Sequence, residues 1–341
     1  MKPPPAEHPD PRVRMAAAAT ETHAPTIVKL LDDSVPDVRV IALQTLGELA
    51  PAALAEHAPA VVVKFKDFDR GVRQVAVSTL GKLEPAKLAP HAPAIVAKLE
   101  DSEWQVRWAA AETLGKLAPA VLAEHADTLV TKLHDAVGGV REAVMWTLGK
   151  LEPEELARHA DALVTKLEDS DEHVRRAAVE ILGKLAPAVL AEHAPAVVAK
   201  LEDSESDVRW EAVQILGKLE PEVLAPHAAA VAAKLEDSDS DVRWAAVKIL
   251  GKLEPEELAR HADALVTKLH DSDKHVRRAA VHTLGKLTPA VLAQHADAIV
   301  AMLNDSERGV RVAAVQILSQ LDPEVLADVT RGRRRALASR W

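Results

Sequence analysis

An internal period of 34 residues runs through almost all of this 341-residue chain. An Arg recurs at this interval from Arg39 to Arg311, nine times, without one insertion or deletion. A His recurs with the same spacing from His23 to His295, also nine times. A unit of this length is too short to bury an apolar face alone, whereas stacked copies bury a continuous core. The period therefore predicts a stack of similar structural units rather than a globular domain.

One unit, residues 221–254, shows what each copy is expected to contain. It opens with a short helical turn at 221–227, where Pro occupies the first position, which a helix tolerates. A helix over 228–236 follows, and the acidic turn at 237–241 supplies an N-cap for a second helix over 242–253. No segment alternates polar and apolar residues with period two. The unit is thus predicted to hold two short helices, and the chain to be all-α with no β-sheet.

Three positions of the unit resemble the HEAT repeat. Pro195, then Asp203, then the Val208 and Arg209 pair show this pattern in full. The resemblance covers residues 13–328. It implies a right-handed α-solenoid whose second helices line a concave side, and an Asp–Arg ladder between neighbouring repeats. By spacing, Arg209 is paired with Asp203 and Arg243 with Asp237. The residues assigned to the structural ladder are Asp203, Arg209, Asp237 and Arg243.

The two ends of the chain depart from the repeat. Residues 1–11 are rich in Pro and are predicted to form a disordered arm. Residues 12–32 form a truncated first unit that caps the stack, and the solenoid as a whole spans 12–328. The remaining tail, 329–341, has five Arg and no acidic residue, which makes it a candidate nuclear-import or anion-binding element.

The amino-acid composition excludes or disfavours several kinds of site and function. The chain has no Cys, which excludes disulfides, thiolate metal sites and a Cys nucleophile. Its formal net charge is −10, and because the tail carries five positive charges, residues 1–328 carry −15. This acidity argues against a general nucleic-acid binder. No apolar run reaches the ~18 residues that span a bilayer, and the N-terminus lacks a signal-peptide core. We therefore expect a cytoplasmic protein without membrane contact, with the nucleus as the alternative if the Arg tail is an import signal.

Candidate binding residues are expected where the units differ. Each residue of a helix is rotated by ~100° from the one before it, so the positions of Trp244 and Lys248 on the second helix point away from the Val, Ala and Leu face. The residues at these two positions differ from unit to unit, and the two sets of equivalent positions are called the varied columns. These columns hold most of the Trp residues, and Trp and Arg are enriched at binding hot spots. An exposed Trp stripe favours a partner that covers it. The alternative is that each ring lies over neighbouring Arg and Lys stems and needs no partner. The residues predicted to bind a partner are Trp104, Trp108, Trp146, Arg176, Trp210, Trp244, Lys248, Arg278 and His282.

Two Lys ladders and the His column each allow a structural and a functional interpretation. One Lys ladder follows the C-terminal ends of the second helices from Lys82 to Lys286, and another follows the first helices from Lys64 to Lys268. Lys ladders favour an acidic partner, but the helix dipole also favours Lys near a C-terminus. Equivalent His side chains in stacked repeats lie ~10 Å apart, whereas metal ligands lie ~2.0–2.2 Å from one ion. No metal site, cofactor or catalytic residue is predicted.

The sequence leaves three functions to consider. We predict a non-enzymatic scaffold that binds a partner protein or peptide, with an acidic one favoured, on its concave face. The second function is a metal-dependent hydroxylase or oxidoreductase of the HEAT type. The resemblance implies His-Glu dipeptides for such an enzyme, and this chain has only the reverse order, as in Glu56-His57. The third function is nucleic-acid binding through the Lys ladder and the Arg tail, which the acidic body disfavours.

Overall fold

The computed structural model of the protein describes residues 5–324 and 327. The chain divides into two compact units, Met1–Lys184 and Leu185–Trp341. Regular structure in the described ranges consists of α-helices and 3-10 helices, and these ranges contain no strand. The helices pack in consecutive pairs, so the prediction of an all-α solenoid without β-sheet is confirmed.

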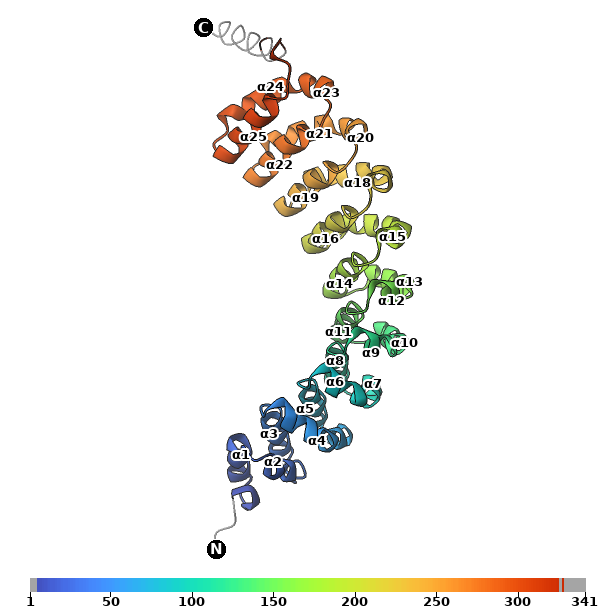
Figure 1. The fold of residues 1–341 in the computed structure, drawn as a ribbon, viewed down its shortest axis with the longest axis vertical. Helices are drawn as coiled ribbons and strands as arrows, with labels where there is room; N and C mark the ends of the chain where they lie inside the picture. Colours follow the sequence, from blue (N-terminus) through green and yellow to red (C-terminus); the bar gives the residue numbers. More distant parts are fainter. Residues whose placement is uncertain (1–4, 325–326, 328–341) are drawn as a thin grey trace. The chain divides into compact units, whose positions relative to one another are not determined.

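Unit 1 begins with a 3-10 turn, η1 (Pro5–Glu7), and a single helix, α1 (Pro11–Thr20). Helix pairs follow, and Figure 1 shows their second helices stacked in sequence order beside a separate row of first helices. The second helices are α3 (Pro36–Leu46), α5 (Arg70–Leu80), α8 (Trp104–Leu114), α11 (Gly138–Leu148) and α14 (Glu172–Leu182). The first helices are α2 (Ala24–Leu30), α4 (Pro51–Val63), α6 (Pro85–Leu88) with α7 (Ala92–Val96), α9 (Pro119–Ala123) with α10 (Ala126–Thr131), and α12 (Pro153–Ala157) with α13 (Ala160–Thr165).

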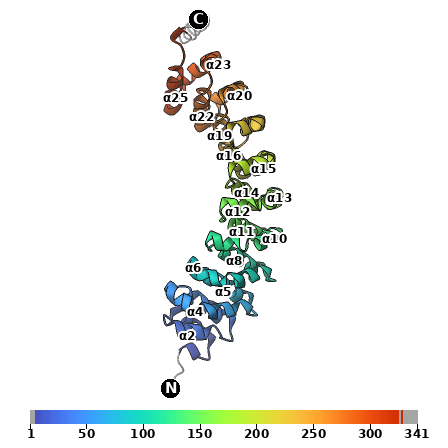
Figure 2. The ribbon, with the colours of Figure 1, turned by 45° about the vertical axis from the view of Figure 1, so that its right-hand side comes forward.

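Unit 2 repeats the same arrangement, and Figure 2 shows its two rows of helices from another side. The second helices are α16 (Ser206–Leu216), α19 (Ser240–Leu250), α22 (Lys274–Leu284) and α25 (Arg308–Leu318). The first helices are α15 (Pro187–Ala199), α17 (Pro221–Leu224) with α18 (Ala228–Ala233), α20 (Pro255–Ala259) with α21 (Ala262–Thr267), and α23 (Pro289–Gln294) with α24 (Ala296–Ala301). Short 3-10 turns end the first helices, as at η9 (Lys234–Glu236).

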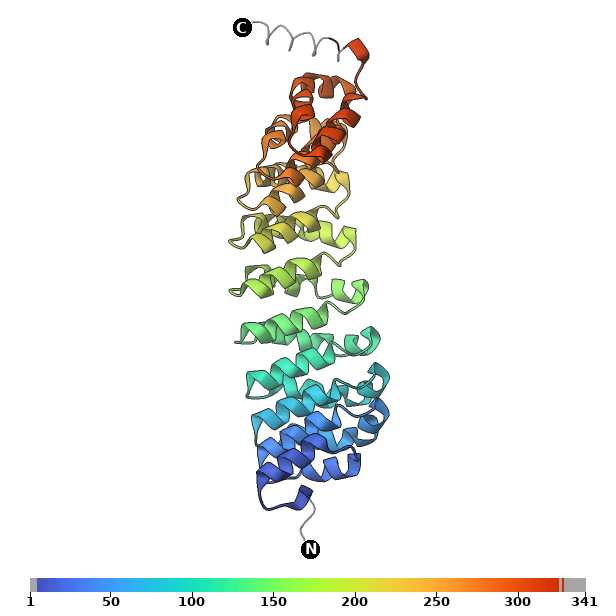
Figure 3. The ribbon, with the colours of Figure 1, turned by 90° about the vertical axis from the view of Figure 1, so that its left-hand side faces the viewer.

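Local sequence explains where the helices of one repeat begin. Pro221 occupies the first turn of α17, where its missing N–H costs no helical hydrogen bond. The Asp239 carboxylate caps α19 by accepting hydrogen bonds from the backbone N–H groups of Asp241 and Val242, at 2.8 and 3.2 Å. Val242 and Ala246 then turn inward and are 0% exposed, so the core consists of small aliphatic side chains. Figure 3 shows the second helices of unit 2 lying in successive layers.

The Gly that recurs at the end of the second helices from Gly47 to Gly285 is explained by close packing. Gly217 has φ −69°, an ordinary helical value, so the position needs no left-handed conformation. A Cβ at Gly217 would instead overlap the Cδ1 atom of Ile249, which reaches across from α19. At Gly251, a Cβ would lie 3.0 Å from Oγ1 of Thr283, whose hydroxyl donates to the Val247 carbonyl at 3.2 Å. The Gly therefore allows the next second helix to approach.

The recurring Arg joins each repeat to the next. Arg209 donates from Nε and Nη2 to the two carboxylate oxygens of Asp237, both at 2.8 Å, and from Nη1 to the backbone carbonyl of Asp203, at 3.0 Å. Arg209 thus contacts Asp203, its neighbour by spacing, through the backbone, whereas its carboxylate partner is the Asp of the following repeat, 28 residues away. The same bidentate pair is formed by Arg39–Asp67, Arg73–Asp101, Arg107–Asp135 and Arg141–Asp169 in unit 1, and by Arg243–Asp271 and Arg277–Asp305 in unit 2.

Each ladder carboxylate also shapes its own turn. Oδ1 of Asp237 accepts the backbone N–H of Asp239 at 3.0 Å, immediately before α19. The side chains of Arg209 and Asp237 are only 11% and 4% exposed. Burial raises the pKa of Asp237, but the hydrogen bonds from Arg209 and Asp239 and the Arg209 charge outweigh it, so the pKa lies below its ordinary value. The ionised carboxylate is therefore the form that the fold stabilises.

The first described residues contact the beginning of the solenoid. Residues 5–7 form η1, and Nη1 of Arg14 on α1 donates to the backbone carbonyls of His8 and Pro9, at 2.8 and 3.0 Å. Arg14 also binds the Asp33 carboxylate through Nε at 2.6 Å, in the place of a ladder Arg. The ladder chemistry thus extends into the truncated cap and holds this segment. Residues 1–4 and the predicted basic tail, 329–341, lie outside the described residues.

Removal of one ladder Arg is expected to destabilise the fold. Arg209→Ala leaves the carboxylate of Asp237 largely buried without its guanidinium, which should cost about 2–3 kcal/mol of unfolding free energy. Arg260→Ala is the control, because its guanidinium is 74% exposed and pairs only with Glu257 on the neighbouring turn. Thermal denaturation should show a clear fall for Arg209→Ala and little change for Arg260→Ala. Equal melting temperatures would contradict a structural role for the ladder.

Stability is also expected to fall at acid pH. The ladder Asp residues have lowered pKa values in the folded state, so their contribution is complete above the unfolded pKa of about 3.9 and is lost as pH falls through the folded pKa. Melting temperatures measured between about pH 6 and about pH 3 should therefore decrease. Asp237→Asn should lower the melting temperature at the upper pH and approach the wild type at the lower one. A difference that stays constant with pH would refute this linkage.

Candidate protein-interaction surface

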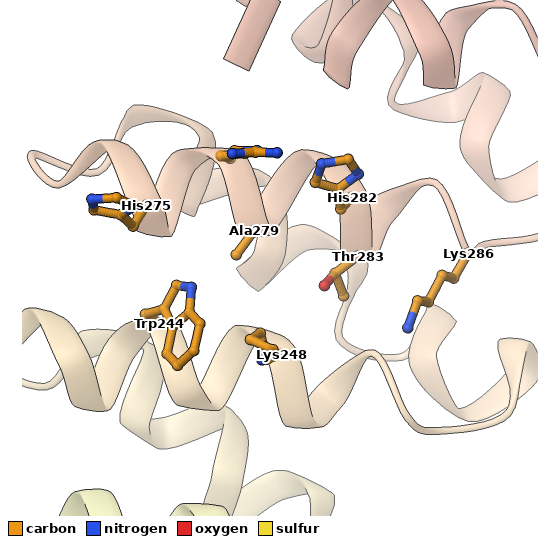
Figure 4. Close-up of a pocket in the computed structure, with 8 residues that line it drawn as sticks. Trp244, Lys248, His275, Ala279, His282, Thr283 and Lys286 are labelled. Atoms are coloured by element: carbon orange, nitrogen blue, oxygen red, sulfur yellow. The ribbon is translucent and has the colours of Figure 1, made fainter. Parts of the chain in front are cut away.

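A groove lies between two neighbouring second helices of unit 2, α19 and α22, with a volume of about 420 Å³. Figure 4 shows Trp244 and Lys248 projecting from α19, and His275 and His282 from α22. This α19/α22 groove is lined by Trp244, Lys248, His275, Arg278, Ala279, His282, Thr283 and Lys286. It brings together four of the residues that were predicted to bind a partner, from two different repeats.

The Trp244 ring is half-buried at the edge of this groove. Nζ of Lys248, one turn further along α19, lies 4.3 Å from the ring centroid, a cation–π contact. This contact is the arrangement that the alternative interpretation of the Trp stripe describes, in which a ring packs against a neighbouring Lys stem. The rest of the ring forms part of the groove wall, so local packing covers only a part of it.

A second cavity of unit 2 lies between α22 and α25, on the other side of Arg278, and is called the α22/α25 cavity. Its volume is about 320 Å³, and it shares Arg278 and His282 with the α19/α22 groove. Arg278 passes over Gly309 on α25, where an added Cβ would lie 3.5 Å from its Cδ. The remaining residues of the α22/α25 cavity are Arg308, Gly309, Val312, Ala313 and Gln316. Neither lining includes an Asp or a Glu, so within the described part of the chain this surface is cationic.

The charge of this surface acts on His282. Partial burial lowers the pKa of His282, and the positive charges of Arg278 and Lys286 lower it further. The neutral form of the imidazole is therefore favoured, and it offers one N–H donor and one acceptor to a ligand.

A second groove lies at the same place in unit 1, between α8 and α11, with a volume of about 490 Å³. Trp108 and Trp146, both half-buried, line it. Nε1 of Trp146 donates to Oε1 of Glu142 at 3.3 Å, which fixes the ring against the preceding turn of α11. The other residues of this α8/α11 groove are Glu112, Gly115, Lys116, Ala143, Thr147 and Lys150. Unlike the α19/α22 groove, it holds equal numbers of Lys and Glu.

The other predicted binding residues lie outside these two grooves. Trp104 begins α8 and is 44% exposed, but it does not line the α8/α11 groove. Arg176 lies half-buried on α14 of unit 1, and Trp210 half-buried on α16 of unit 2. The predicted order of Arg176, Trp210, Trp244 and Arg278 along one groove spans both units and stays a prediction.

Several groove residues are not among the predicted binding residues. Glu112 and Glu142 stand in the two varied columns, but Trp and Arg are the residue types that predict a binding hot spot. His275 lies three residues before Arg278 on the same face of α22, and Arg308 lies four residues before Val312 on α25. Their helical spacing from Arg278 and Val312 was the signal that would have found them.

The two Lys ladders make contacts between repeats. Nζ of Lys184 donates to the Gly149 carbonyl at 3.1 Å, and Nζ of Lys286 to the Gly251 carbonyl at 2.6 Å, each at the end of the preceding second helix. On the first helices, Lys268 pairs with Glu236 of the preceding repeat at 2.7 Å. These bonds support the structural interpretation of both ladders. In the α19/α22 groove, the cations of Lys248 and Arg278 belong to neither ladder.

The His column occupies backbone junctions. His261 precedes α21, and its carbonyl accepts the N–H of Leu265 at 3.0 Å. Burial lowers the pKa of His261, so its neutral form is favoured. Among the described residues, no group of three or more His, Cys, Asp or Glu side chains is placed to hold a metal ion. In the same residues, no helix has the length and apolar character needed to cross a membrane.

Comparisons with known proteins place the chain in the HEAT-repeat family. The family described as HEAT repeats matches residues 92–164, 160–234 and 228–319, and a single HEAT repeat matches residues 24–53. The chain belongs to this family, whose solenoids are typical of protein-interaction scaffolds. A search of curated proteins gave no match. The crystal structure of an engineered protein is similar in fold, with 17% sequence identity, a TM-score of 0.64, and coverage of 92% of this chain and 96% of that chain.

Purified protein is expected to contain no stoichiometric iron or zinc. Equivalent His residues sit in different layers of the stack, ~10 Å apart, so they do not converge on one ion. Elemental analysis after dialysis checks this expectation. One equivalent of either metal, retained through dialysis, would contradict it and would favour the hydroxylase alternative.

Proposed function

We propose that the protein is a non-enzymatic scaffold that binds a partner protein or peptide on the exposed surface of its second helices. This is the surface that the HEAT resemblance implies to be concave. The grooves α8/α11 and α19/α22 lie on it, and each contains a half-buried Trp whose ring forms part of the wall. We further propose that acidic segments are favoured in unit 2 and that the protein works in the cytoplasm.

One observation carries this proposal. The positions that hold the stack together are nearly constant, whereas the groove positions differ from repeat to repeat. Arg243 and Val242 are examples of the constant set, and they form the ladder and the core. Trp244 and Lys248 stand one and five residues after Arg243, yet neither is part of that core. Variation confined to solvent-accessible grooves is what recognition of a specific partner requires, because packing does not demand it.

The Trp side chains are expected to separate binding from stability. A Trp buries ~150–250 Å² on contact, so Trp210→Ala combined with Trp244→Ala should weaken partner binding at least tenfold, about 1.4 kcal/mol. Both rings lie outside the buried Val, Ala and Leu face, so the melting temperature should stay within a few degrees. The partner is first captured from the native source, and its affinity for each variant is then measured by titration.

Arg209→Ala is the matched control, because it is the residue immediately before Trp210 but belongs to the ladder. It should lower the melting temperature and, at temperatures where the protein remains folded, leave partner affinity unchanged. If the Trp pair proves strongly destabilising while binding survives, the rings are packing elements and the proposed surface is wrong.

A further inference from the structure

The α8/α11 and α19/α22 grooves are equivalent, four repeats apart, so their residues can be compared position by position. Trp108 of the first groove corresponds to Trp244 of the second, and Lys150 corresponds to Lys286. Among the positions that line both grooves, three other pairs differ in charge or size: Glu112 and Lys248, Glu142 and Arg278, Trp146 and His282. His275 lines only the α19/α22 groove, because its equivalent in unit 1 is Gly139. Any difference in what the two grooves bind is therefore expected to arise mainly from these three positions.

The first two differences reverse the charge of the groove. Two carboxylates in unit 1 are replaced by an ammonium and a guanidinium in unit 2. Within the described residues, Arg278 forms no hydrogen bond or ion pair, and Lys248 contacts only the Trp244 ring. The ladder residue Arg277, by contrast, is occupied by Asp305. Arg278 and Lys248 therefore keep their capacity to bind an anionic group.

The third difference changes which groups can donate. In unit 1, the Trp146 indole N–H is used by Glu142 within the same helix. In unit 2, His282 stands in its place, between Arg278 and Lys286, and its imidazole is exposed. The smaller ring leaves Arg278 open to both the α19/α22 groove and the α22/α25 cavity, which adds the cation of Arg308.

We propose that the α19/α22 groove binds an acidic peptide segment of the partner, and that Lys248, Arg278 and His282 determine this preference. The proposal rests on the proposed function and adds the site and the chemistry of the bound segment. Arg278 supplies a planar fork that matches a carboxylate, and Lys248 supplies a point charge beside the apolar surface of Trp244.

The size of the cationic surface favours a peptide over a nucleic acid. Proteins that bind duplex DNA tightly through its backbone neutralise on the order of 6–10 phosphates. The two adjoining cavities offer only Lys248, Arg278, Lys286 and Arg308, and the Lys286 ammonium already binds the Gly251 carbonyl. The formal charge of −15 on residues 1–328 repels a long polyanion, whereas a short acidic segment meets only the local surface.

The first test uses a fluorescently labelled Glu-rich decapeptide and its counterpart with Lys at every Glu. The wild-type chain should bind the Glu peptide at least tenfold more tightly than the Lys peptide. The variant K248E/R278E/H282W gives unit 2 the three residues of the α8/α11 groove and should lose this preference. All three side chains lie outside the Arg–Asp ladder, and a thermal melt checks that the variant is folded.

The reciprocal variant supplies the matched control. E112K/E142R/W146H gives unit 1 the three residues of the α19/α22 groove and should create a second site for the Glu peptide, so the binding stoichiometry should rise from one to two. E112K/E142R keeps the half-buried Trp146 in place and covers the case in which its replacement destabilises α11. If the charges acted only by changing the net charge of the whole protein, this variant would not acquire a second binding site for the Glu peptide.

Three results would overturn the proposal. They are no preference of the wild type for the Glu peptide, full retention of that preference in folded K248E/R278E/H282W, and tighter binding of a single-stranded oligonucleotide with a steep salt dependence. Each refutes the preference for acidic segments but leaves the scaffold function standing if Trp210→Ala with Trp244→Ala still weakens binding of the captured partner. Conversely, a normal peptide preference with no effect of the Trp pair on that partner would refute the wider surface but not the acidic site.

Discussion

The hydrogen-bonded pair between an Arg and the Asp of the next repeat is the contact on which the rest of the structure depends. A single guanidinium binds the carboxylate of one repeat and a backbone carbonyl of its own, as Arg243 does with Asp271 and Asp237. The same carboxylate orders the turn that begins the next second helix. Since a 34-residue unit has too little core to fold alone, a directional bond is needed to set how consecutive units meet. Val315 illustrates the need: it is 57% exposed on α25, whereas the equivalent Val281 and Val247 are 0% exposed beneath a following repeat.

The positions that hold the repeats together differ from the positions that line the grooves, so the groove positions are free to vary. The ladder, the small aliphatic core and the close approach at Gly217 use a fixed set of positions on each second helix. Lys184, Lys252 and Lys286 at the helix ends belong to the same set, because each donates to a carbonyl of the preceding repeat. Among the described bonds, positions 142 and 278 take no part in the ladder or in these Lys contacts, so a Glu and an Arg are tolerated at these equivalent positions. Their difference changes the surface potential without changing the repeat.

Much of the fold followed from periodicity, because stacking demands the same residues every 34 positions. The two helices of the 221–254 unit, its Pro start and its Asp cap were all predictable from local rules. The ladder partner of Arg209 was not, because Asp203 and Asp237 are equally repeated and only the geometry of stacking selects the latter. The groove was predictable in part: helical spacing found Trp244 and Arg278. The acidic residues Glu112 and Glu142 could be compared with Lys248 and Arg278 only after the structure showed that both pairs line equivalent grooves.

The same logic indicates where specificity resides in a repeat scaffold of this kind. A substitution at a ladder position disturbs two repeats at once, since Asp237 serves both the Arg209 bond and the α19 cap region. A substitution at Lys248 disturbs one ring contact and no inter-repeat bond. Stability and recognition are therefore encoded at different positions only one to five residues apart on the same helix. The charge of a groove therefore depends on residues that make no inter-repeat bond, as the acidic Glu142 and the basic Arg278 show at equivalent positions.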